Sequence, residues 1–271
     1  HSISPLMHNE SFRLLGLDYV YLCFDVNEET LPAAVAGLKT CGIRGFNLTM
    51  PNKNKIVELL DELSPEAQLI GAVNTVLNDN GKLIGYNTDG YGFMQSVRDA
   101  GHDITGKNIT VMGVGGASMA ICAQSALDGA ASVHIFARRT SRYWNRTQKF
   151  AENLSAKTGC QVCLFDNDDH TALRDSIAQS YLLINATSVG MVPDIDDTII
   201  KDTSLFHPEL VVADVVYEPQ ETRLLREAKA AGCQTFNGMY MLLHQGAKAF
   251  QIWTGQEMPV SVIKEKYFSV K

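Results

Sequence analysis

The sequence lacks a surplus of basic residues, a long apolar run and a cysteine framework. Its 271 residues include 30 acidic and 23 basic side chains, which gives a net charge of −7 and a pI of about 5.5. Nucleic acids and anionic membranes bind basic surfaces, so this balance argues against both as partners. No apolar run approaches the roughly 20 residues of a membrane-spanning helix.

The six cysteines are scattered, and the first residues show no signal-peptide pattern. Both features are typical of a reduced, cytoplasmic protein. Cys160 and Cys163 match C-x-x-C, but in a strand-like run residues three positions apart face opposite sides of the sheet. No second pair accompanies them. We therefore expect no metal site.

Helix-like and strand-like segments alternate along the whole chain, the pattern of an α/β protein. Strand-like segments in the first part include 19–26 and 45–49, and the turn Asn78-Asp-Asn-Gly81 predicts a hairpin over 73–86. We predict two α/β domains. An N-terminal substrate-binding domain covers 1–103 and is completed by helices at 239–271 that return to it, and a Rossmann-like dinucleotide-binding domain covers 104–238.

A glycine turn joins the strand expected at 109–112 to the helix expected at 118–127. Its residues are Gly113, Gly115, Gly116, Ala117 and Ser118. A turn of this kind, between a strand and a helix and followed by a second strand, places a pyrophosphate on the free N–H groups of the helix. Ser118 replaces the third glycine of the usual fingerprint, and its hydroxyl suits a helix cap or a phosphate. The turn predicts dinucleotide binding.

The second strand of this unit is expected at 133–136, and Arg138, Arg139 and Thr140 follow it. An NAD site usually carries an acidic residue here for the ribose hydroxyls, whereas an NADP site carries arginine for the 2′-phosphate. No acidic residue stands at this strand end, and guanidinium groups pair well with phosphate. The pattern favours NADP, with NAD possible.

Polar residues gather near strand ends of the first block, where ligands bind in open α/β sheets. They form four clusters, which are Ser2 with Ser4, Thr49 with Lys53, Asn74, and Asn87-Thr88-Asp89-Gly90. Hydroxyls, amides, one amine and one carboxylate suit a small polyhydroxylated acid. Each also has a structural interpretation: Ser4 and Asp89 could cap helices, Asn74 could satisfy backbone groups, and Lys53 could be a surface lysine.

Eight stretches together resemble the shikimate dehydrogenase family, which includes the shikimate/quinate dehydrogenases. They occur in the family's order and span nearly the whole sequence. They are His1–Pro5, Asn47–Lys53, Gly71–Thr75, Gly85–Gly90, Gly113–Ser118, Asn185–Met191, Asp214–Pro219 and Gly238–Gln245. The resemblance also implies a further strand before residue 1, and the sequence departs from the family's pattern at Ala137, Thr140 and Tyr240.

The resemblance assigns a role to each matching residue. Lys53 and Asp89 match the catalytic pair, and Ser2 and Ser4 match the hydroxyls that hold the substrate carboxylate. The other implied contacts are ring-hydroxyl binding by Thr49, Asn74 and Gln245, a place in the cleft between the domains for Tyr217, and cofactor contacts for Thr187, Ser188, Val189 and Gly238.

The implied activity is NADP-dependent reduction of 3-dehydroshikimate to shikimate, in the pathway to chorismate and the aromatic amino acids. Lys53 and Asp89 handle the proton, and Lys53 either transfers it or only polarises the substrate oxygen. The implied protein is a monomer or homodimer. One alternative is a shikimate/quinate dehydrogenase that accepts NAD or NADP. A non-catalytic dinucleotide sensor would have no need of Lys53 and Asp89 together, and a folate-type dehydrogenase would need a more apolar pocket.

Overall fold

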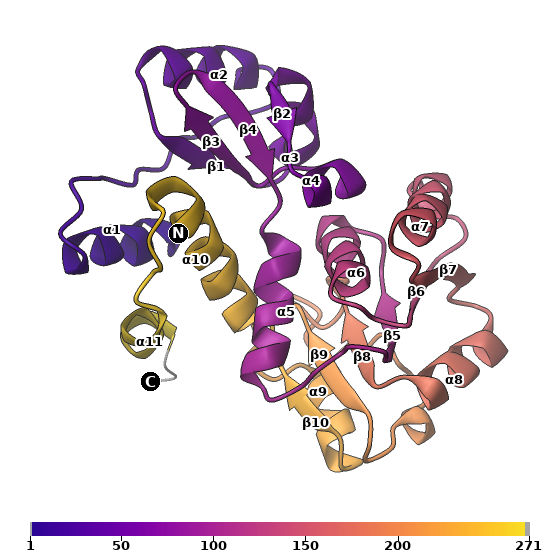
Figure 1. Cartoon of the computed structure of the whole chain (residues 1–271). Helices are drawn as coiled ribbons and strands as arrows, with labels where there is room; N and C mark the ends of the chain where they lie inside the picture. The colour runs from indigo at the N-terminus through magenta and orange to yellow at the C-terminus, as the bar shows by residue number, and fades with distance from the viewer. Residues whose placement is uncertain (1, 269–271) are drawn as a thin grey trace. The chain divides into compact units, whose positions relative to one another are not determined.

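The computed structural model of the protein describes residues 2–268 (Figure 1). The chain folds into two compact units. Unit 1 comprises His1–Gly92 and Leu242–Lys271, and unit 2 comprises Phe93–Met241. Both boundaries fall inside helices, α5 (Asp89–Asp99) and α10 (Met239–Thr254). The first boundary lies earlier than the predicted one after residue 103, because the Phe93 ring already packs against Phe236 of unit 2, 6.2 Å away.

Unit 1 contains a four-stranded sheet with the order β1-β3-β4-β2. The strands are β1 (Gly45–Asn47), β2 (Glu62–Leu63), β3 (Thr75–Asp79) and β4 (Lys82–Tyr86). Strands β3 and β4 form the predicted hairpin. Its turn has positive φ at both Asn80 and Gly81, which is the backbone that an Asn-Gly pair favours between antiparallel strands.

The predicted strand at 19–26 is wrong. This segment forms no strand and pairs with none among the described residues, and Val20, Leu22 and Phe24 are each more than half exposed. The alternating pattern of residues 19–26 is typical of a strand with two different faces. A strand also needs a neighbouring backbone for its hydrogen bonds. Here the Asn9 side chain takes that place, bonding both the N–H and the carbonyl of Tyr21.

Two apolar groups hold unit 1 together. One joins the sheet to the helices around it and includes Leu31, Ile56, Val76 and Leu83. The other is aromatic and centres on His8, whose ring lies among residues of α1, α10 and the 19–26 segment. The helices of unit 1 are α1 (Ser4–Leu14), α2 (Leu31–Thr40), α3 (Asn52–Lys55), η1 (Ile56–Leu59), α4 (Pro65–Ile70), α11 (Val260–Ile263) and η3 (Lys264–Phe268).

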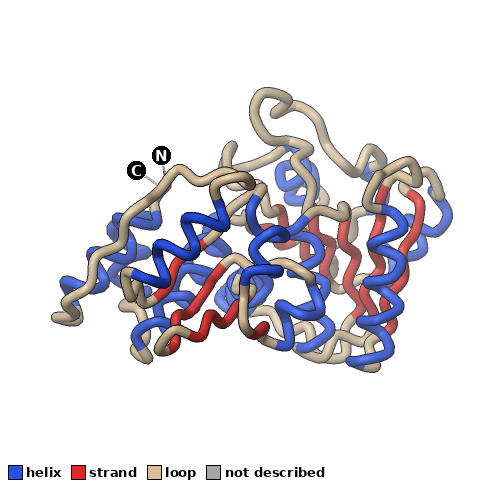
Figure 2. The backbone as a smooth tube through the Cα atoms, turned by 90° about the horizontal axis from the view of Figure 1, so that it is seen from above, coloured by secondary structure: helices blue, strands red, loops and turns tan. Residues whose placement is uncertain are grey.

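Unit 2 is a six-stranded parallel sheet with the order β10-β9-β8-β5-β6-β7, whose strands Figure 2 draws in red. The strand order reverses direction between β5 and β8, which is where α/β sheets bind ligands. The strands are β5 (Asn108–Met112), β6 (Ser132–Ala137), β7 (Gln161–Asp166), β8 (Leu182–Asn185), β9 (Val211–Asp214) and β10 (Gln234–Phe236). This is the predicted Rossmann-like arrangement.

Helices cover the sheet of unit 2 through a buried apolar core. Met112, Phe136, Leu183 and Val212 from four neighbouring strands belong to one cluster with Leu224 of α9. Such near-continuous apolar strands are typical of a parallel sheet that is buried on both faces. The helices are α6 (Gly116–Leu127), α7 (Trp144–Thr158), α8 (His170–Gln179), η2 (Thr203–Leu205) and α9 (Arg223–Ala230).

No helix within residues 2–268 is long and apolar enough to cross a membrane. In the same range, no three His, Cys, Asp or Glu side chains gather as metal ligands. Cys160 and Cys163 are both free, and burial raises the pKa of the Cys160 thiol to about 11.

Candidate active site

Lys53 and Asp89 form a close ion pair in unit 1. Lys53 Nζ lies 2.6 Å from Asp89 Oδ2, and the two side chains are 19% and 12% exposed. Lys53 belongs to the short helix α3, which follows the turn after β1, and Asp89 is the first residue of α5. The pair is therefore largely screened from water by the protein but still reachable by a small ligand. Lys55, two residues along, is 47% exposed and, among the described residues, forms its ion pair with Glu58.

The Asn74 side chain bonds the other oxygen of Asp89. Asn74 Nδ2 donates to Asp89 Oδ1 at 2.9 Å, while Asn74 Oδ1 accepts the backbone N–H of Thr88 at 2.9 Å. A backbone N–H is always a donor, so this contact fixes which end of the amide is the oxygen. Both oxygens of Asp89 thus accept hydrogen bonds, one from Lys53 and one from Asn74.

Local structure explains why these residues meet. Helix α4 begins at a Ser64 cap with Pro65 in its first turn and ends at Gly71, whose φ of 68° turns the chain toward Asn74. The N–H of Val73 then donates to the Lys53 carbonyl at 2.8 Å, and the N–H of Asn74 donates to the Tyr86 carbonyl at 3.0 Å. Backbone bonds therefore hold α3, β3 and β4 at one place.

Two further predicted residues lie nearby. Gln245 is on α10, and its Oε1 is 3.5 Å from Asn74 Nδ2, a long contact that a ligand hydroxyl could replace. Thr49 is exposed in the turn before α3, where its carbonyl accepts the Asn52 N–H at 3.0 Å. The returning C-terminal segment thus contributes a side chain to the same polar cluster.

Ser2 and Ser4 lie at the start of α1. The Ser2 Oγ accepts a hydrogen bond from the backbone N–H of Ser4 at 3.2 Å. Ser2, rather than Ser4, therefore satisfies a backbone N–H at the start of α1. The Ser4 hydroxyl bonds the Tyr21 hydroxyl, which in turn donates to Asn47 Oδ1 at 2.9 Å. Burial is the main reason why the pKa of Tyr21 rises to about 12, so this phenol stays protonated.

The glycine turn of unit 2 has the geometry of an anion site. Gly113 has a φ of 112°, and Gly115 precedes the first turn of α6. A Cβ added to Gly115 or Gly116 would meet no atom within 4 Å, so open space lies in front of the helix. The first N–H groups of α6, from Gly116 to Ser118, have no partner within the helix and suit a phosphate. The turn therefore fits a dinucleotide pyrophosphate.

Ser118 behaves differently from its prediction. Its side chain is fully buried, and its hydroxyl donates to the Gly113 carbonyl at 2.5 Å. It neither caps α6, whose cap is Gly115, nor offers its hydroxyl to a phosphate. The reason is that the third position of α6 points back over the turn, so the serine side chain closes the loop. Only its backbone N–H remains for a ligand.

Arg138, Arg139 and Thr140 are exposed directly after β6. Strand β6 pairs with β5 in parallel, Phe136 opposite Met112, so both turns leave the same edge of the sheet. The Arg139 guanidinium lies over the Trp144 ring, 5.2 Å from its centroid. A guanidinium held on an indole ring suits a phosphate or an adenine ring. The glycine turn, which fits the pyrophosphate, lies at the same edge of the sheet.

Residues 187–189 follow β8, the neighbour of β5 on its other side. Thr187 Oγ1 donates to Asn185 Oδ1 at 2.6 Å, and Val189 N–H donates to Thr187 Oγ1 at 3.1 Å. Asn185 also donates to Asp214, which accepts from Val216 and Thr222 as well. Burial outweighs these bonds and raises the pKa of Asp214 to about 6.

Gly238 and Tyr217 complete the predicted set. A Cβ on Gly238 would lie 2.1 Å from the Val215 carbonyl oxygen, so only glycine fits there. Tyr217 is 45% exposed in the loop after β9. Close packing against Val215 therefore explains why residue 238 is glycine. The exposed Tyr217 side chain is available to a ligand.

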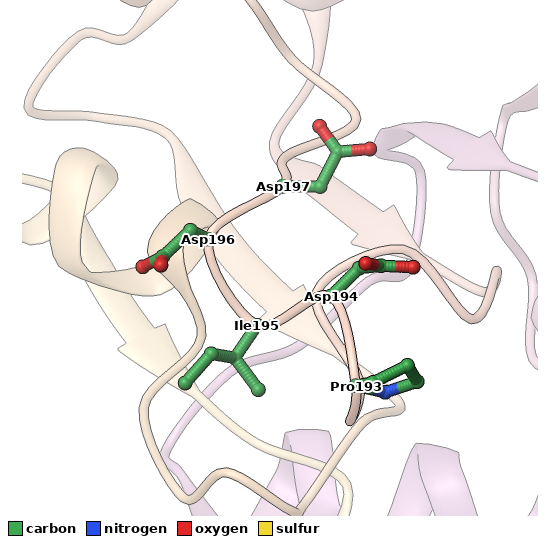
Figure 3. A pocket seen from close by; sticks show the side chains of 5 residues that line it. All are labelled: Pro193, Asp194, Ile195, Asp196 and Asp197. Carbon is green, nitrogen blue, oxygen red and sulfur yellow. The ribbon is translucent and has the colours of Figure 1, made fainter.

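Two hollows lie along the loop after β8, away from the glycine turn in sequence. The larger, of about 410 Å³, is lined by Pro193–Asp197, and a second of about 300 Å³ by Ser188–Asp194 and Asp197. Figure 3 shows that the carboxylates of Asp194, Asp196 and Asp197 point in different directions. These carboxylates do not converge on one point, and their negative charge would repel a phosphate. We therefore do not place the cofactor in the larger hollow.

Comparison with known proteins identifies the family of this chain. The shikimate dehydrogenase substrate binding domain matches residues 1–76, and the shikimate 5'-dehydrogenase C-terminal domain matches residues 238–266. A protein of Listeria innocua named shikimate dehydrogenase (NADP(+)) is 52% identical over 268 residues, 99% of this chain and 92% of the relative. This chain belongs to the shikimate dehydrogenase family.

Solved structures place the chain within the same family. A Listeria monocytogenes shikimate 5-dehydrogenase in complex with shikimate and NAD is 52% identical, with a TM-score of 0.95 over 98% of this chain and 91% of that one. A Corynebacterium glutamicum quinate dehydrogenase in complex with NAD is 32% identical, with a TM-score of 0.87 over 99% and 95%. The recognised family and the two-domain α/β fold are confirmed.

Several residues of the polar network went unassigned at the sequence level. Tyr21, Asn47, Thr75 and Thr88 all bond one another or Asn74. Their partners come from segments far apart in the chain, which no spacing reveals. One signal was present: Asn47 ends β1 and Thr75 begins β3, and a polar residue packed in the protein needs a partner.

Proposed function

We propose that this chain catalyses the reversible reduction of 3-dehydroshikimate to shikimate with NADP, in the cytoplasm, as a monomer or homodimer. The observation that carries the proposal is the Lys53–Asp89 pair, with Asn74 bonded to the second oxygen of the carboxylate. Family membership gives the reaction its substrate, since the relative from Listeria innocua is named shikimate dehydrogenase (NADP(+)). The residue roles that follow are those that the family resemblance implies, and the geometry of the Lys53–Asp89–Asn74 group supports them.

Reduction of a ring ketone adds a hydride to carbon and a proton to oxygen. The nicotinamide supplies the hydride when it is bound. Lys53 carries three N–H donors, and one is directed at Asp89, so others are available for the ketone oxygen. In our proposal Lys53 and Asp89 handle the proton: the Lys53 ammonium donates to the developing alkoxide, and Asp89 holds the ammonium in place and shares the proton relay.

The substrate's other groups have matching partners in unit 1. We propose that the Ser2 and Ser4 hydroxyls bind its carboxylate, and that Thr49, Asn74 and Gln245 bind its ring hydroxyls. The long 3.5 Å contact between Gln245 and Asn74 supports this, because a hydroxyl that came between them would make shorter bonds to both. We assign Tyr217 of unit 2 to the substrate as well.

For the cofactor we propose three groups of residues in unit 2. The pyrophosphate binds at Gly113, Gly115 and Gly116, and at the first N–H groups of α6 from Ala117 and Ser118. Arg138, Arg139 and Thr140 bind the 2′-phosphate of NADP. Residues 187–189 and Gly238 lie beside the nicotinamide. The open space in front of α6 and the exposed arginine pair support this assignment.

Replacement of Lys53 tests the proposal, and Lys55 provides a matched control on the same helix. We expect Lys53→Ala to lower kcat by about a thousandfold, within the usual range for removal of a proton-handling group, while shikimate still binds by calorimetry. Lys55→Ala should keep parental kcat, because its ammonium pairs with the exposed Glu58. Near-normal turnover in Lys53→Ala would overturn the catalytic assignment.

A second candidate function is a shikimate/quinate dehydrogenase that accepts NAD or NADP. Two neighbours favour it, since the Listeria monocytogenes structure contains NAD and the Corynebacterium glutamicum enzyme is a quinate dehydrogenase. Steady-state rates with shikimate and quinate, each with both cofactors, separate the candidates. Our first choice predicts the highest kcat/KM for shikimate with NADP, and turnover of quinate with NAD alone would contradict it.

A further inference from the structure

A chain of buried and partly buried hydrogen bonds runs from the strand β1 to the Lys53–Asp89 pair. Asn47 Nδ2 donates to Thr75 Oγ1 at 3.0 Å, and Thr75 Oγ1 donates to Asn74 Oδ1 at 3.0 Å. Asn74 Nδ2 then donates to Asp89 Oδ1 at 2.9 Å, and Lys53 donates to Asp89 Oδ2. All five residues belong to unit 1, and Thr75 is fully buried.

Backbone groups fix the amide ends of Asn47 and Asn74, and Thr75 Oγ1 also lies 3.4 Å from Thr88 Oγ1. Asn47 Nδ2 also contacts the Asn74 carbonyl, at 3.1 Å, and a carbonyl only accepts, so this end of Asn47 is the NH₂. Thr75 therefore accepts from Asn47, and its own hydrogen is free to point at Asn74 Oδ1. That oxygen also accepts the Thr88 N–H. With its oxygen held by two donors, the Asn74 amide can present only N–H groups to Asp89.

A 180° flip of the Asn74 side-chain amide would reverse this arrangement. A flipped Asn74 would bring its oxygen against Asp89, and two acceptors facing each other repel. Asp89 would then move away, and the Lys53 ammonium would move with it. A small displacement of a catalytic group costs far more rate than binding, because catalysis needs near-attack geometry. The group that holds the amide thus controls the position of the reacting ammonium.

We propose that Thr75 is a positioning residue of the reaction, which acts on Lys53 through Asn74 and Asp89. Its side chain is fully buried, so a ligand cannot reach its hydroxyl, which bonds Asn74 instead. Asn47 orients that hydroxyl, and the Tyr21 hydroxyl in turn orients Asn47 through Asn47 Oδ1 at 2.9 Å. This role rests on the proposed function, since it needs Lys53 and Asp89 to handle the proton.

The test is a double-mutant cycle between Thr75 and Asn74. Thr75→Val keeps the shape and removes the hydroxyl, and Thr75→Ser keeps the hydroxyl. We expect Thr75→Val to lower kcat about tenfold, the effect of one lost hydrogen bond of about 1.4 kcal/mol, with the KM for NADP unchanged. Thr75→Ser should restore most of kcat. In an Asn74→Ala background, Thr75→Val should have no further effect.

The outcomes separate this inference from the function it rests on. If Asn74→Ala lowers kcat but Thr75→Val does not, Thr75 has no positioning role and the proposed function stands. If Thr75→Val lowers kcat equally in both backgrounds, its effect is general and the inference is wrong. If Lys53→Ala keeps turnover, the proposed function itself fails. Should Thr75→Val fold poorly by circular dichroism, Thr75→Ala at lower temperature gives the same cycle.

Discussion

The buried histidine of unit 1 makes the stability of the protein depend on pH in a predictable way. His8 is fully buried and stacks on Tyr21 at 4.6 Å and on Phe250 at 6.2 Å. Within residues 2–268, neither ring nitrogen has a hydrogen-bond partner. Burial therefore lowers the pKa of His8 from 6.5 to about 3, because an imidazolium would lose its hydration without gaining an acceptor.

The sign follows from which state binds the proton. Below pH 6.5 the unfolded chain protonates His8, whereas the folded chain does not until about pH 3. The unfolded state holds more protons in that window, so the free energy of unfolding falls as the pH falls. Each pKa unit corresponds to about 1.36 kcal/mol, so at pH 4.5 the loss is about 3 kcal/mol, and it reaches about 5 kcal/mol near pH 3.

We expect His8→Phe to remove this loss. The chain has two tryptophans, and Trp253 lies 5.3 Å from His8, so its fluorescence reports the unfolding of unit 1 in a Trp144→Phe background. Urea unfolding at pH 7 and pH 4.5 then gives the change in free energy. Between these values the parent should lose about 3 kcal/mol more than His8→Phe. The variant should also be at least as stable at pH 7, because it buries no unpaired nitrogen.

Replacement of the exposed His170 by phenylalanine is the matched control. It removes one imidazole from a place open to water, and it should leave the parental pH dependence of stability unchanged. An equal loss of stability in the parent and in His8→Phe would refute the reasoning. It would mean that His8 gains a partner or water in the folded protein.

Three further predictions concern unit 2. Burial raises the pKa of Asp214 to about 6, so between pH 4 and 6.5 the folded state keeps a proton that the unfolded state loses. This opposes the His8 effect, and over that range the free energy of unfolding of Asp214→Asn should rise by about 3 kcal/mol more than that of the parent in calorimetric melts. Gly238→Ala should lower the stability of unit 2 by about 2 kcal/mol or more, because its Cβ meets a backbone oxygen, and an unchanged melting temperature would contradict this. Replacement of Arg138 and Arg139 together by alanine should raise the KM for NADP at least about tenfold and leave the KM for NAD nearly unchanged in steady-state assays.

The fold was largely predictable because its elements carry local signals. Alternating apolar strands and helices predicted the parallel sheet of unit 2, and the Asn80-Gly81 turn predicted the hairpin of unit 1. The segment 19–26 shows the limit. Its alternation is genuine, but strand formation depends on a neighbour's backbone, which the segment's own residues do not specify.

The site was predictable in its residues and less so in its connections. Lys53 and Asp89 were recognised as a pair from their motifs, and the structure places them 2.6 Å apart. The hydroxyl of Ser118 was expected at a cap or phosphate and instead bonds the Gly113 carbonyl, since side-chain direction in a tight turn depends on the turn's own geometry. The bonds of Thr75 join three separate segments, and only the folded chain brings them together.

The helices α5 and α10 connect the two units, and each carries a candidate site residue within one turn of the connection. Asp89 lies just before the boundary at Gly92, and Gln245 lies just after the boundary at Leu242. The Gly92 N–H donates to the Thr88 carbonyl, so the first turn of α5 is closed by a bond across the residues that fix Asp89. Local opening of that turn would release Asp89 and Lys53 together. The amide of Gly92 should therefore exchange with solvent at a rate that reports how often the catalytic pair is lost.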